Sequence, residues 1–249
     1  MLEILFQYGS VTIRTFNILL AFAFLFGGIY LIRYANRRKM NMSFLAHHAF
    51  TVLMAMLIGG RILYVLENTE LFTNNPIYIL FFWDLNFSFF GVLYGMIAAL
   101  VFLTRKYRED LWSWFDACML SMLSGMIFVH LGHFFNGSQY GKPTDLPWGI
   151  AFDTQNIPYL NPIHPTQIYS MLLALIVFLY VSKKSKRTDL FGIVGTMGLM
   201  LYSLGMMGLD FTHGDASIYV KVSYGVIAAL SFISLVHCSH KKLTLQIQK

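Results

Sequence analysis

The sequence has little charge. Only 12% of its 249 residues are Asp, Glu, Lys or Arg, whereas 57% are hydrophobic. A soluble globule of this size needs more charged residues to cover its surface, so the composition excludes one and predicts an integral membrane protein. The net charge of +6 would suggest an anionic partner for a soluble domain, but basic residues mainly set orientation in membrane proteins. Nucleic acid is therefore a poor candidate partner.

Cysteine is also scarce, and the chain has no metal motif. Its two cysteines, Cys118 and Cys238, fall near predicted cytoplasmic helix ends, where thiols stay reduced. There is no CxxC pair and no HExxH, and histidines three residues apart are a weak zinc signal. We expect no disulfide, no metal and no cofactor. Without repeats or low-complexity segments, residues 1–249 are expected to form a single integral membrane domain.

Long apolar runs are what the sequence does contain. Runs of about 20 residues predict membrane-spanning helices, which gives an all-α, polytopic fold with about seven spans. The first run ends in four basic residues and has no small-residue cleavage site, so we expect it to stay as a span. Residues 76–83 are too short to cross and are expected at the interface. The seven predicted spans are 16–34, 43–66, 88–103, 113–135, 165–182, 190–208 and 218–238.

Basic residues alternate between the connections. Of the 18 Lys and Arg residues, 14 lie in residues 33–39, residues 105–108, residues 183–187 and the C-terminal tail. The positive-inside rule places these segments in the cytoplasm. The N-terminus and residues 67–87, 136–163 and 209–217 are then predicted outside, and the C-terminus inside. Arg14, Arg61, Lys142 and Lys221 are the four basic residues left in the outer half.

The fourth predicted span ends in a polar face. His130, His133 and Asn136 follow one another at spacings of three, which puts them on one side of a helix. Asn136-Gly137 is a pair that can close a helix with a left-handed residue. Ionisable groups inside a membrane indicate a functional site, but histidines at the rim can also simply bond neighbouring carbonyls. Both interpretations are open at this point.

Other outer helix ends carry polar residues too. Arg61 and Tyr64 share a face after Gly59-Gly60, a pair that allows another backbone to approach closely. Arg61 could extend to lipid phosphate as a surface residue, or point inward as an anion anchor.

Pro165 suits the first position of a helix, which makes His164 the predicted cap and Gln167 a first-turn residue. Helix starts favour anions, so His164 is either a simple cap or part of a phosphate site. Asp210, His213 and Asp215 add polar groups to the same side.

Two segments of the sequence resemble the prolipoprotein diacylglyceryl transferases of bacteria, and the similarity covers about residues 10 to 230. The first is the ordered run Gly132-x-Phe134-x-Asn136-Gly137-x-x-Tyr140-Gly141-x-Pro143-Thr144-Asp145-Leu146-Pro147-Trp148-Gly149. The second is His164-Pro165-Thr166-Gln167-Ile168-Tyr169. Supporting matches include Gly60-Arg61, Tyr64-Val65, Ser88-Phe89-x-Gly91, Asp116, Gly125, Tyr202 and Gly205.

The resemblance implies a seven-span enzyme of the bacterial inner membrane. This family moves diacylglycerol from phosphatidylglycerol to the lipobox cysteine thiol of a preprolipoprotein and releases glycerol phosphate. The expected partners are therefore phosphatidylglycerol or another anionic phospholipid, a preprolipoprotein signal peptide and the lipid bilayer. The residues expected to bind substrate are Arg61, Tyr64, Gly137, His164, Gln167, Tyr169, Asp210 and His213, and those expected to act in catalysis are His130, His133 and Asn136.

Several positions depart from the family pattern. His130 and His133 stand where the family has an arginine and an asparagine, and His213 replaces a later arginine. Phe16, Phe90 and Met206 stand where the family has tyrosine, histidine and arginine. Each lost arginine removes charge-assisted hydrogen bonds worth about 1.5–3 kcal/mol.

Three hypotheses follow from these matches and departures. The chain is a divergent transferase in which Arg61 and the helix start at His164 hold phosphate while His130 or His133 assists the thiol. Alternatively, it is a catalytically degenerate paralogue that binds phospholipid or lipoprotein. The third alternative is a related lipid reaction that uses the substituted histidines.

Overall fold

The fold is given by a computed structural model that describes residues 4–8, 11–73, 75–84, 86–152, 157–188, 190–214 and 218–247. Asp215 and the basic residue Lys249 lie outside this part of the chain. Each of the seven predicted apolar runs forms a helix. These helices are α1 (Thr15–Arg37), α2 (Met42–Glu67), α4 (Phe89–Tyr107), α5 (Leu111–Asn136), α6 (Thr166–Ser185), α7 (Ile193–Leu209) and α8 (Ile218–Ile247).

Within the described residues, six of these helices are long and apolar enough to cross a membrane. The remaining one, α7, has 17 residues, which at 1.5 Å per residue is about 25 Å and is at the short end of the range for a span. The prediction of a polytopic helical membrane protein is confirmed. The direction of the chain across the membrane stays a prediction.

A short β-hairpin precedes the first span and was not predicted. Strands β1 (Ile4–Tyr8) and β2 (Val11–Arg14) pair antiparallel, with Phe6 opposite Ile13. The sequence does carry a signal for it, because Gly9-Ser10 separates two runs rich in aromatic and β-branched residues. These runs are too short to cross a membrane.

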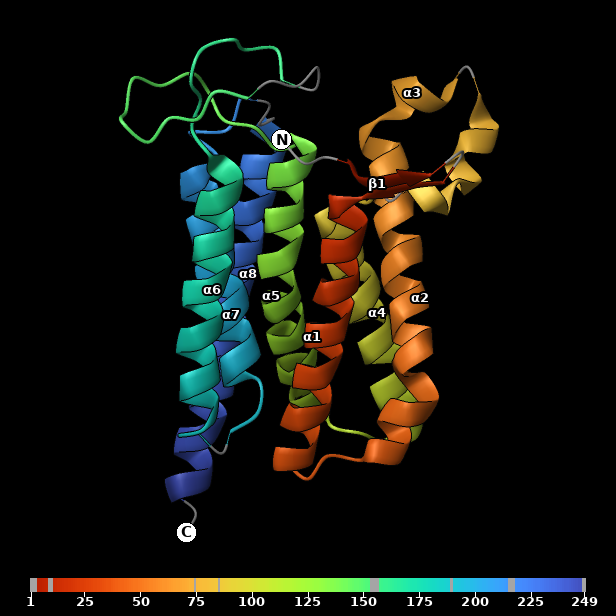
Figure 1. Cartoon of the computed structure of the whole chain (residues 1–249). Helices are drawn as coiled ribbons and strands as arrows, with labels where there is room; N and C mark the ends of the chain where they lie inside the picture. Colours follow the sequence, from red (N-terminus) through yellow and green to blue (C-terminus); the bar gives the residue numbers. More distant parts are fainter. Residues whose placement is uncertain are drawn as a thin grey trace. The chain divides into compact units, whose positions relative to one another are not determined.

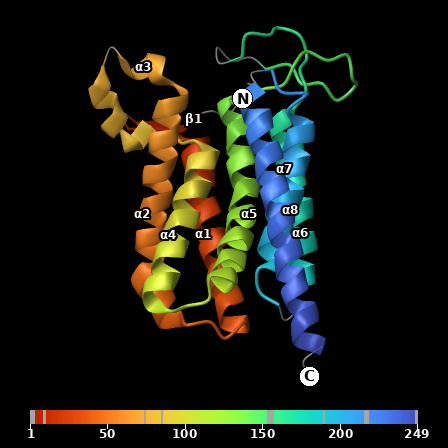
Figure 2. The same cartoon turned by 180° about the vertical axis from the view of Figure 1, so that it is seen from behind.

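The chain divides into two compact units, which are described separately. Unit 1 contains residues 1–34 and 116–249, and unit 2 contains residues 35–115. In unit 2, α2 and α4 lie side by side (Figures 1 and 2). Their outer connection holds α3 (Thr69–Thr73) and two 3-10 helices, η1 (Pro76–Leu80) and η2 (Phe82–Asp84). Residues 76–83 are thus too short to cross, as predicted.

Glycines bring α2 and α4 into backbone contact. A Cβ atom added to Gly91 would overlap the carbonyl oxygen of Gly59, and one added to Gly95 would overlap that of Ala55. Ser88 occupies the cap position of α4, and its hydroxyl donates to Glu67 Oε1 at 2.9 Å. The close backbone approach predicted for Gly59-Gly60 is confirmed, and small residues are the usual means of such packing in membranes.

Substitution Gly95→Ala should therefore destabilise the protein. The new methyl group collides with backbone, which cannot move aside like a side-chain tip, and overpacking costs about 1–3 kcal/mol. Gly28→Ala is the matched control, since a Cβ at Gly28 meets nothing within 4 Å and alanine suits a helix better by about 0.5–1 kcal/mol. Thermal unfolding in detergent should show a lower midpoint for Gly95→Ala alone. Equal midpoints for the two variants would contradict this packing.

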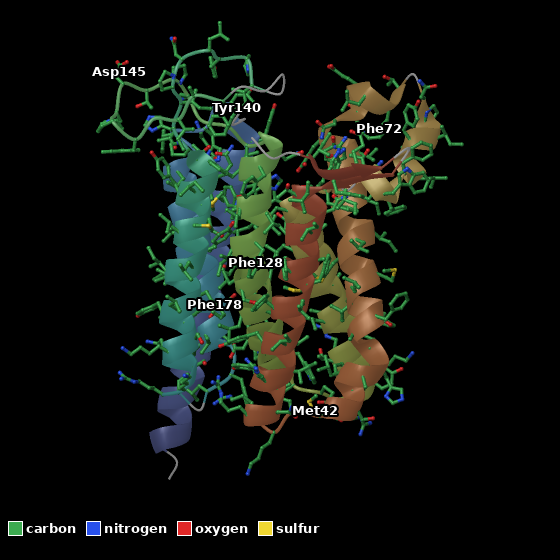
Figure 3. All side chains as sticks on the ribbon, in the orientation of Figure 1. Met42, Phe72, Phe128, Tyr140, Asp145 and Phe178 are labelled. Atoms are coloured by element: carbon green, nitrogen blue, oxygen red, sulfur yellow. The ribbon has the colours of Figure 1, made fainter. Side chains whose placement is uncertain are left out.

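Unit 1 is built from α1, α5, α6, α7 and α8. The contacts of α7 with α6 and α8 are extensive, and α1 packs on α5 and α6 through rings. Phe26 stacks on Phe128 with centroids 4.8 Å apart, and Tyr30 meets Phe178 edge-on at 4.9 Å. Figure 3 labels Phe128 on α5 and Phe178 on α6. Small residues also join α1 and α5, because Ser121 Oγ donates to Gly27 O at 2.8 Å.

A buried carboxylate ties α5 to the start of α7. The Asp116 side chain is fully buried, and its two oxygens accept the backbone N–H groups of Gly192 at 2.8 Å and Gly195 at 2.6 Å. These N–H groups have no partner inside the helix, and a negative charge suits a helix N-terminus. Asp116 therefore fixes the position of α7 along α5.

The connection between α5 and α6 is a folded cap rather than an open loop. Helix α5 ends at Asn136, and Gly137 has φ 68°, so the predicted left-handed ending is confirmed. Short bridges join Pro143 and Ile150 to Ile163. Buried Phe152, Ile157 and Ile163 form a small core. The cap lies over the ends of α5 and α6 and carries Tyr140 and Asp145 (Figures 1 and 3).

Candidate functional site

His130 is the most deeply placed histidine at this end of unit 1. Its side chain is 2% exposed, and its Nε2 lies 2.8 Å from the hydroxyl of Tyr202 on α7. Its other ring nitrogen, Nδ1, is buried and has no hydrogen-bond partner among the described residues. One nitrogen is thus fixed by the protein, and the other keeps its hydrogen-bonding capacity.

His133 lies on the same face, as its spacing predicts. Its ring centroid is 6.3 Å from that of His130, and its Nδ1 is 2.7 Å from Ser138 Oγ. Phe16 packs against the His133 ring at 5.2 Å. Asn136, the third predicted member, is half-buried at the last position of α5. The helix thus brings His130 and His133 together as one pair.

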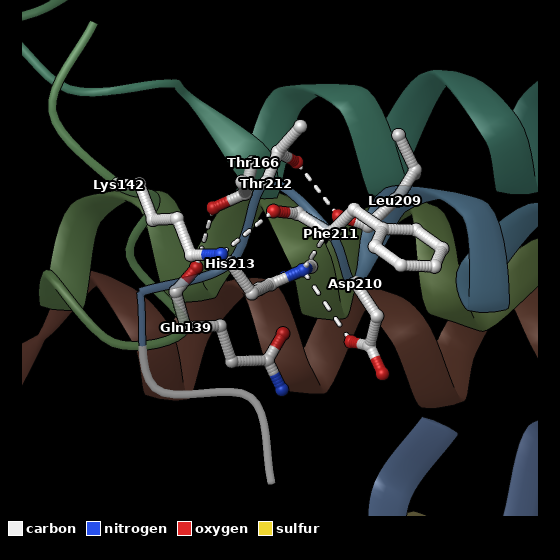
Figure 4. Close-up of polar contacts among 8 residues, drawn as sticks. All are labelled: Gln139, Lys142, Thr166, Leu209, Asp210, Phe211, Thr212 and His213. Atoms are coloured by element: carbon white, nitrogen blue, oxygen red, sulfur yellow. Dashed lines mark hydrogen bonds and ion pairs between the residues drawn. The ribbon is translucent and has the colours of Figure 1, made fainter. Parts of the chain in front are cut away.

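Asp210 and His213 close the outer turn after α7. Both are buried, and His213 Nδ1 lies 3.5 Å from Asp210 Oδ1 and 3.2 Å from Leu209 O (Figure 4). The turn that carries Asp210 and His213 and the helix that carries the histidine pair both belong to unit 1. Gly141 pairs with His213 in a short bridge, which attaches this turn to the cap.

His164 belongs to a neighbouring aromatic group. Helix α6 begins at Thr166 with Pro165 at the cap position, so the prediction of His164 as the cap is wrong by one residue. Pro165 has ψ 68°, outside the helical range, so the helix starts at the next residue. His164 Nδ1 lies 3.4 Å from Tyr169 Oη, which accepts a hydrogen bond from Trp148 Nε1 at 2.7 Å.

Gln167 lies in the first turn of α6, as predicted. Its side chain is fully buried, and its Nε2 donates to Ser138 O at 2.8 Å. Gly137, buried at the turn after α5, precedes that serine. Gln167 therefore joins the start of α6 to the segment that follows the histidine face.

Arg61 and Tyr64 lie in unit 2, where Arg61 is 1% exposed. Its guanidinium donates to three backbone carbonyls of the outer connection, those of Tyr78, Ile79 at 3.0 Å and Asn86 at 3.2 Å. Its Cζ lies 5.7 Å from the Tyr64 ring centroid. These contacts hold the segment between η1 and α4 on helix α2.

Substitution Arg61→Lys is expected to destabilise the protein by about 2–4 kcal/mol. Lysine keeps the charge but cannot fork to three carbonyls, and hydrogen bonds from charged donors contribute about 1.5–3 kcal/mol each. Thermal unfolding and proteolysis within residues 76–86 would measure the loss. If the lysine variant instead unfolds like the wild type but no longer binds phosphatidylglycerol, Arg61 binds an anion and does not stabilise the outer connection.

At three positions the chain has an apolar residue where the resemblance implies a polar one. All three side chains are well packed. Phe90 and Met206 are buried, and a Cβ on Gly132 would touch the Phe16 ring at 2.8 Å. These side chains contribute volume in place of charge.

Sequence reasoning missed Ser138 and Gln139 as site residues and gave Tyr202 no role there. Tyr202 reaches His130 across 72 positions of sequence, which no local pattern reports. The described residues contain no group of three or more His, Cys, Asp or Glu side chains that could hold a metal ion. The arrangement can accept a proton, orient hydroxyl groups and bind a polar headgroup.

Comparison with known proteins decides the family. The family model described as prolipoprotein diacylglyceryl transferase matches residues 3–239. The chain belongs to this family.

Three relatives from the prolipoprotein diacylglyceryl transferase family illustrate the similarity, and each is named phosphatidylglycerol–prolipoprotein diacylglyceryl transferase. The protein of Synechococcus elongatus is 28% identical over 222 residues, which cover 85% of this chain and 77% of the relative. That of Trichormus variabilis is 28% identical over 244 residues, which cover 93% of this chain and 86% of the relative. That of Aliivibrio salmonicida is 32% identical over 210 residues, covering 81% and 71%. The similarity thus extends over most of each chain.

Proposed function

We propose that this protein transfers diacylglycerol from phosphatidylglycerol to the lipobox cysteine thiol of a prolipoprotein. The family match over residues 3–239 is the observation that carries the proposal. We place the protein in the bacterial inner membrane, where the signal peptide of the prolipoprotein is its second substrate. The two units are expected to act as one membrane domain.

His130 is the proposed general base. If its Nε2–H donates to Tyr202 Oη, a lone pair remains on Nδ1, the nitrogen without a partner in the described chain. That nitrogen accepts the thiol proton as the sulfur attacks the glyceryl carbon of the lipid. A carbon–sulfur bond forms, the carbon–oxygen bond to phosphate breaks, and glycerol phosphate leaves with the electron pair. Positioned bases contribute about 10²–10⁴-fold to such steps.

The other polar residues have supporting roles. His133 and Asn136 orient the thiol, and Asp210 holds His213, which faces the lipid phosphate. Gln167, Gly137 and the start of α6 near His164 and Tyr169 bind the headgroup. Arg61 and Tyr64 of unit 2 also bind substrate in this proposal.

The buried polar network favours this function over a degenerate paralogue. His130, Gln167, Tyr202, Asp210 and His213 are all buried, and polar groups are costly inside a membrane. Drift without function removes such groups first. Here the two substituted histidines each have a hydrogen-bond partner.

Complementation tests the proposal in cells. A bacterial strain depleted of its own transferase should grow when it expresses this protein, and its lipoproteins should carry diacylglycerol. A membrane-inserted protein that neither restores growth nor modifies lipoproteins would reject the transferase function.

A further inference from the structure

Ser138 and Gln139 form a short segment that the protein holds in a strained shape. Gln139 has φ 54°, a left-handed backbone that residues other than glycine adopt at a cost. Three contacts hold the segment. Thr166 Oγ1 donates to Gln139 O at 2.7 Å (Figure 4), Gln167 Nε2 donates to Ser138 O at 2.8 Å, and His133 Nδ1 lies 2.7 Å from Ser138 Oγ. Strain maintained in this way is characteristic of functional sites.

Two amide oxygens at this segment are buried without a hydrogen bond. Neither Gln139 Oε1 nor Gln167 Oε1 has a partner among the described residues. The Gln167 oxygen is identified by chemistry, because the other amide atom donates to a carbonyl and must be the nitrogen. Gln139 lies beside His130, whose Nδ1 is also buried without a hydrogen-bond partner among the described residues. Buried acceptors are almost always paired, and an amide oxygen has two lone pairs, so each of these oxygens can accept a hydrogen bond from a donor outside the protein.

The missing donor is best met by hydroxyl groups. An amide oxygen accepts hydrogen bonds and repels phosphate or carboxylate oxygens. An ammonium group could also donate, but it is strongly hydrated and costly to bury, and the nearby ring of His130 provides no negative charge. Two separate neutral acceptors match a headgroup that carries two hydroxyls.

We propose that Gln139 and Gln167 form the subsite for the glycerol headgroup of the donor lipid. Each amide oxygen accepts a hydrogen bond from one headgroup hydroxyl. The inference rests on the proposed function and adds to it the residues that select the lipid. A site built to bond a hydroxyl rejects an analogue that lacks it, because its own polar groups are then left unpaired. We expect roughly 10- to 100-fold selection for two such bonds.

Three lipids distinguish the contribution of the headgroup hydroxyls from those of the phosphodiester charge and of an ammonium group. Phosphatidylglycerol carries the hydroxyls, phosphatidylethanol has the same phosphodiester charge without them, and phosphatidylethanolamine carries an ammonium. Binding of each to the purified full-length protein is measured by native mass spectrometry, and transfer to a lipobox peptide is measured separately. The wild type should prefer phosphatidylglycerol over both other lipids in binding, whether or not transfer occurs.

Gln139→Met is the informative variant, because none of the described residues donates a geometrically defined hydrogen bond to the Gln139 amide oxygen. Its preference for phosphatidylglycerol over phosphatidylethanol should fall at least fivefold. Gln7→Met, on an exposed strand residue, is the matched control and should keep the wild-type ratio. Equal binding of phosphatidylglycerol and phosphatidylethanol by the wild type would overturn the subsite, as would an unchanged ratio in Gln139→Met or tighter binding of phosphatidylethanolamine. Selective binding without transfer would support the subsite and count against the proposed function alone.

Discussion

His130→Ala is expected to reduce diacylglyceryl transfer by at least about 100-fold. The variant removes the only nitrogen that the account uses as a base, and positioned bases contribute about 10²–10⁴-fold. His130→Gln separates chemistry from packing, because its amide nitrogen can still reach the Tyr202 hydroxyl but cannot take a proton at the position of Nδ1. Both variants should therefore be inactive, and the glutamine variant should unfold close to the wild-type temperature.

The control for this prediction is His47→Ala. His47 is exposed on α2 and bonds only within its own turn among the contacts described, to Ser43 O at 2.7 Å. Its removal should leave transfer unchanged. Transfer rates are measured with phosphatidylglycerol and a lipobox peptide at saturating concentrations of both. Full activity in His130→Gln would assign the base to another residue, and His133 would be the next to test.

Asp116→Ala should lower the stability of the protein by about 3–5 kcal/mol. The substitution leaves the N–H groups of Gly192 and Gly195 without their acceptor, and each buried unpaired group costs about 1–3 kcal/mol. It also removes a charge that suits the start of α7. For a chain of this length the loss corresponds to a fall of roughly 6–20 °C in the unfolding midpoint.

Asp116 acts on the site through the position of α7. Tyr202 lies ten residues after Gly192, so the anchor at the helix start fixes the height at which the tyrosine meets His130. Asp116→Asn keeps one acceptor oxygen and should lose less stability than the alanine variant. Asp145→Ala, on an exposed cap residue, is the matched control and should stay within about 0.5 kcal/mol of the wild type. Thermal unfolding that is identical for Asp116→Ala and the wild type would refute the anchor.

The helices of this protein could be predicted because membrane spans are local features. About 20 apolar residues in a row satisfy their own backbone only as a helix, so runs such as 43–66 identify α2 directly. The end of α5 was also predictable, since the adjacent residues Asn136 and Gly137 are a pair that commonly ends a helix with a left-handed backbone. The start of α6 was misplaced by one residue because a proline can occupy either the cap or the first helical position.

The contacts that define the site are not local and escaped prediction. Gln167 was found by its place in a first turn, but its bond to Ser138 depends on how the cap folds back on α6. Asp116 was noted only as part of a family pattern, and its role depends on the packing of α5 against α7. Arg61 was expected to bind an anion, and its three carbonyl contacts were invisible until the outer connection was placed on α2. Sequence showed which residues were polar, whereas the fold showed what they bond.

Transfer by the purified protein tests the central claim most directly. The protein is incubated with phosphatidylglycerol and a lipobox peptide, and the peptide mass is followed together with the release of glycerol phosphate. We predict a peptide that gains one diacylglyceryl group on its cysteine, with one glycerol phosphate released for each, and no reaction with a peptide whose cysteine is replaced by serine. A folded, lipid-binding protein that leaves the cysteine peptide unmodified would contradict the account.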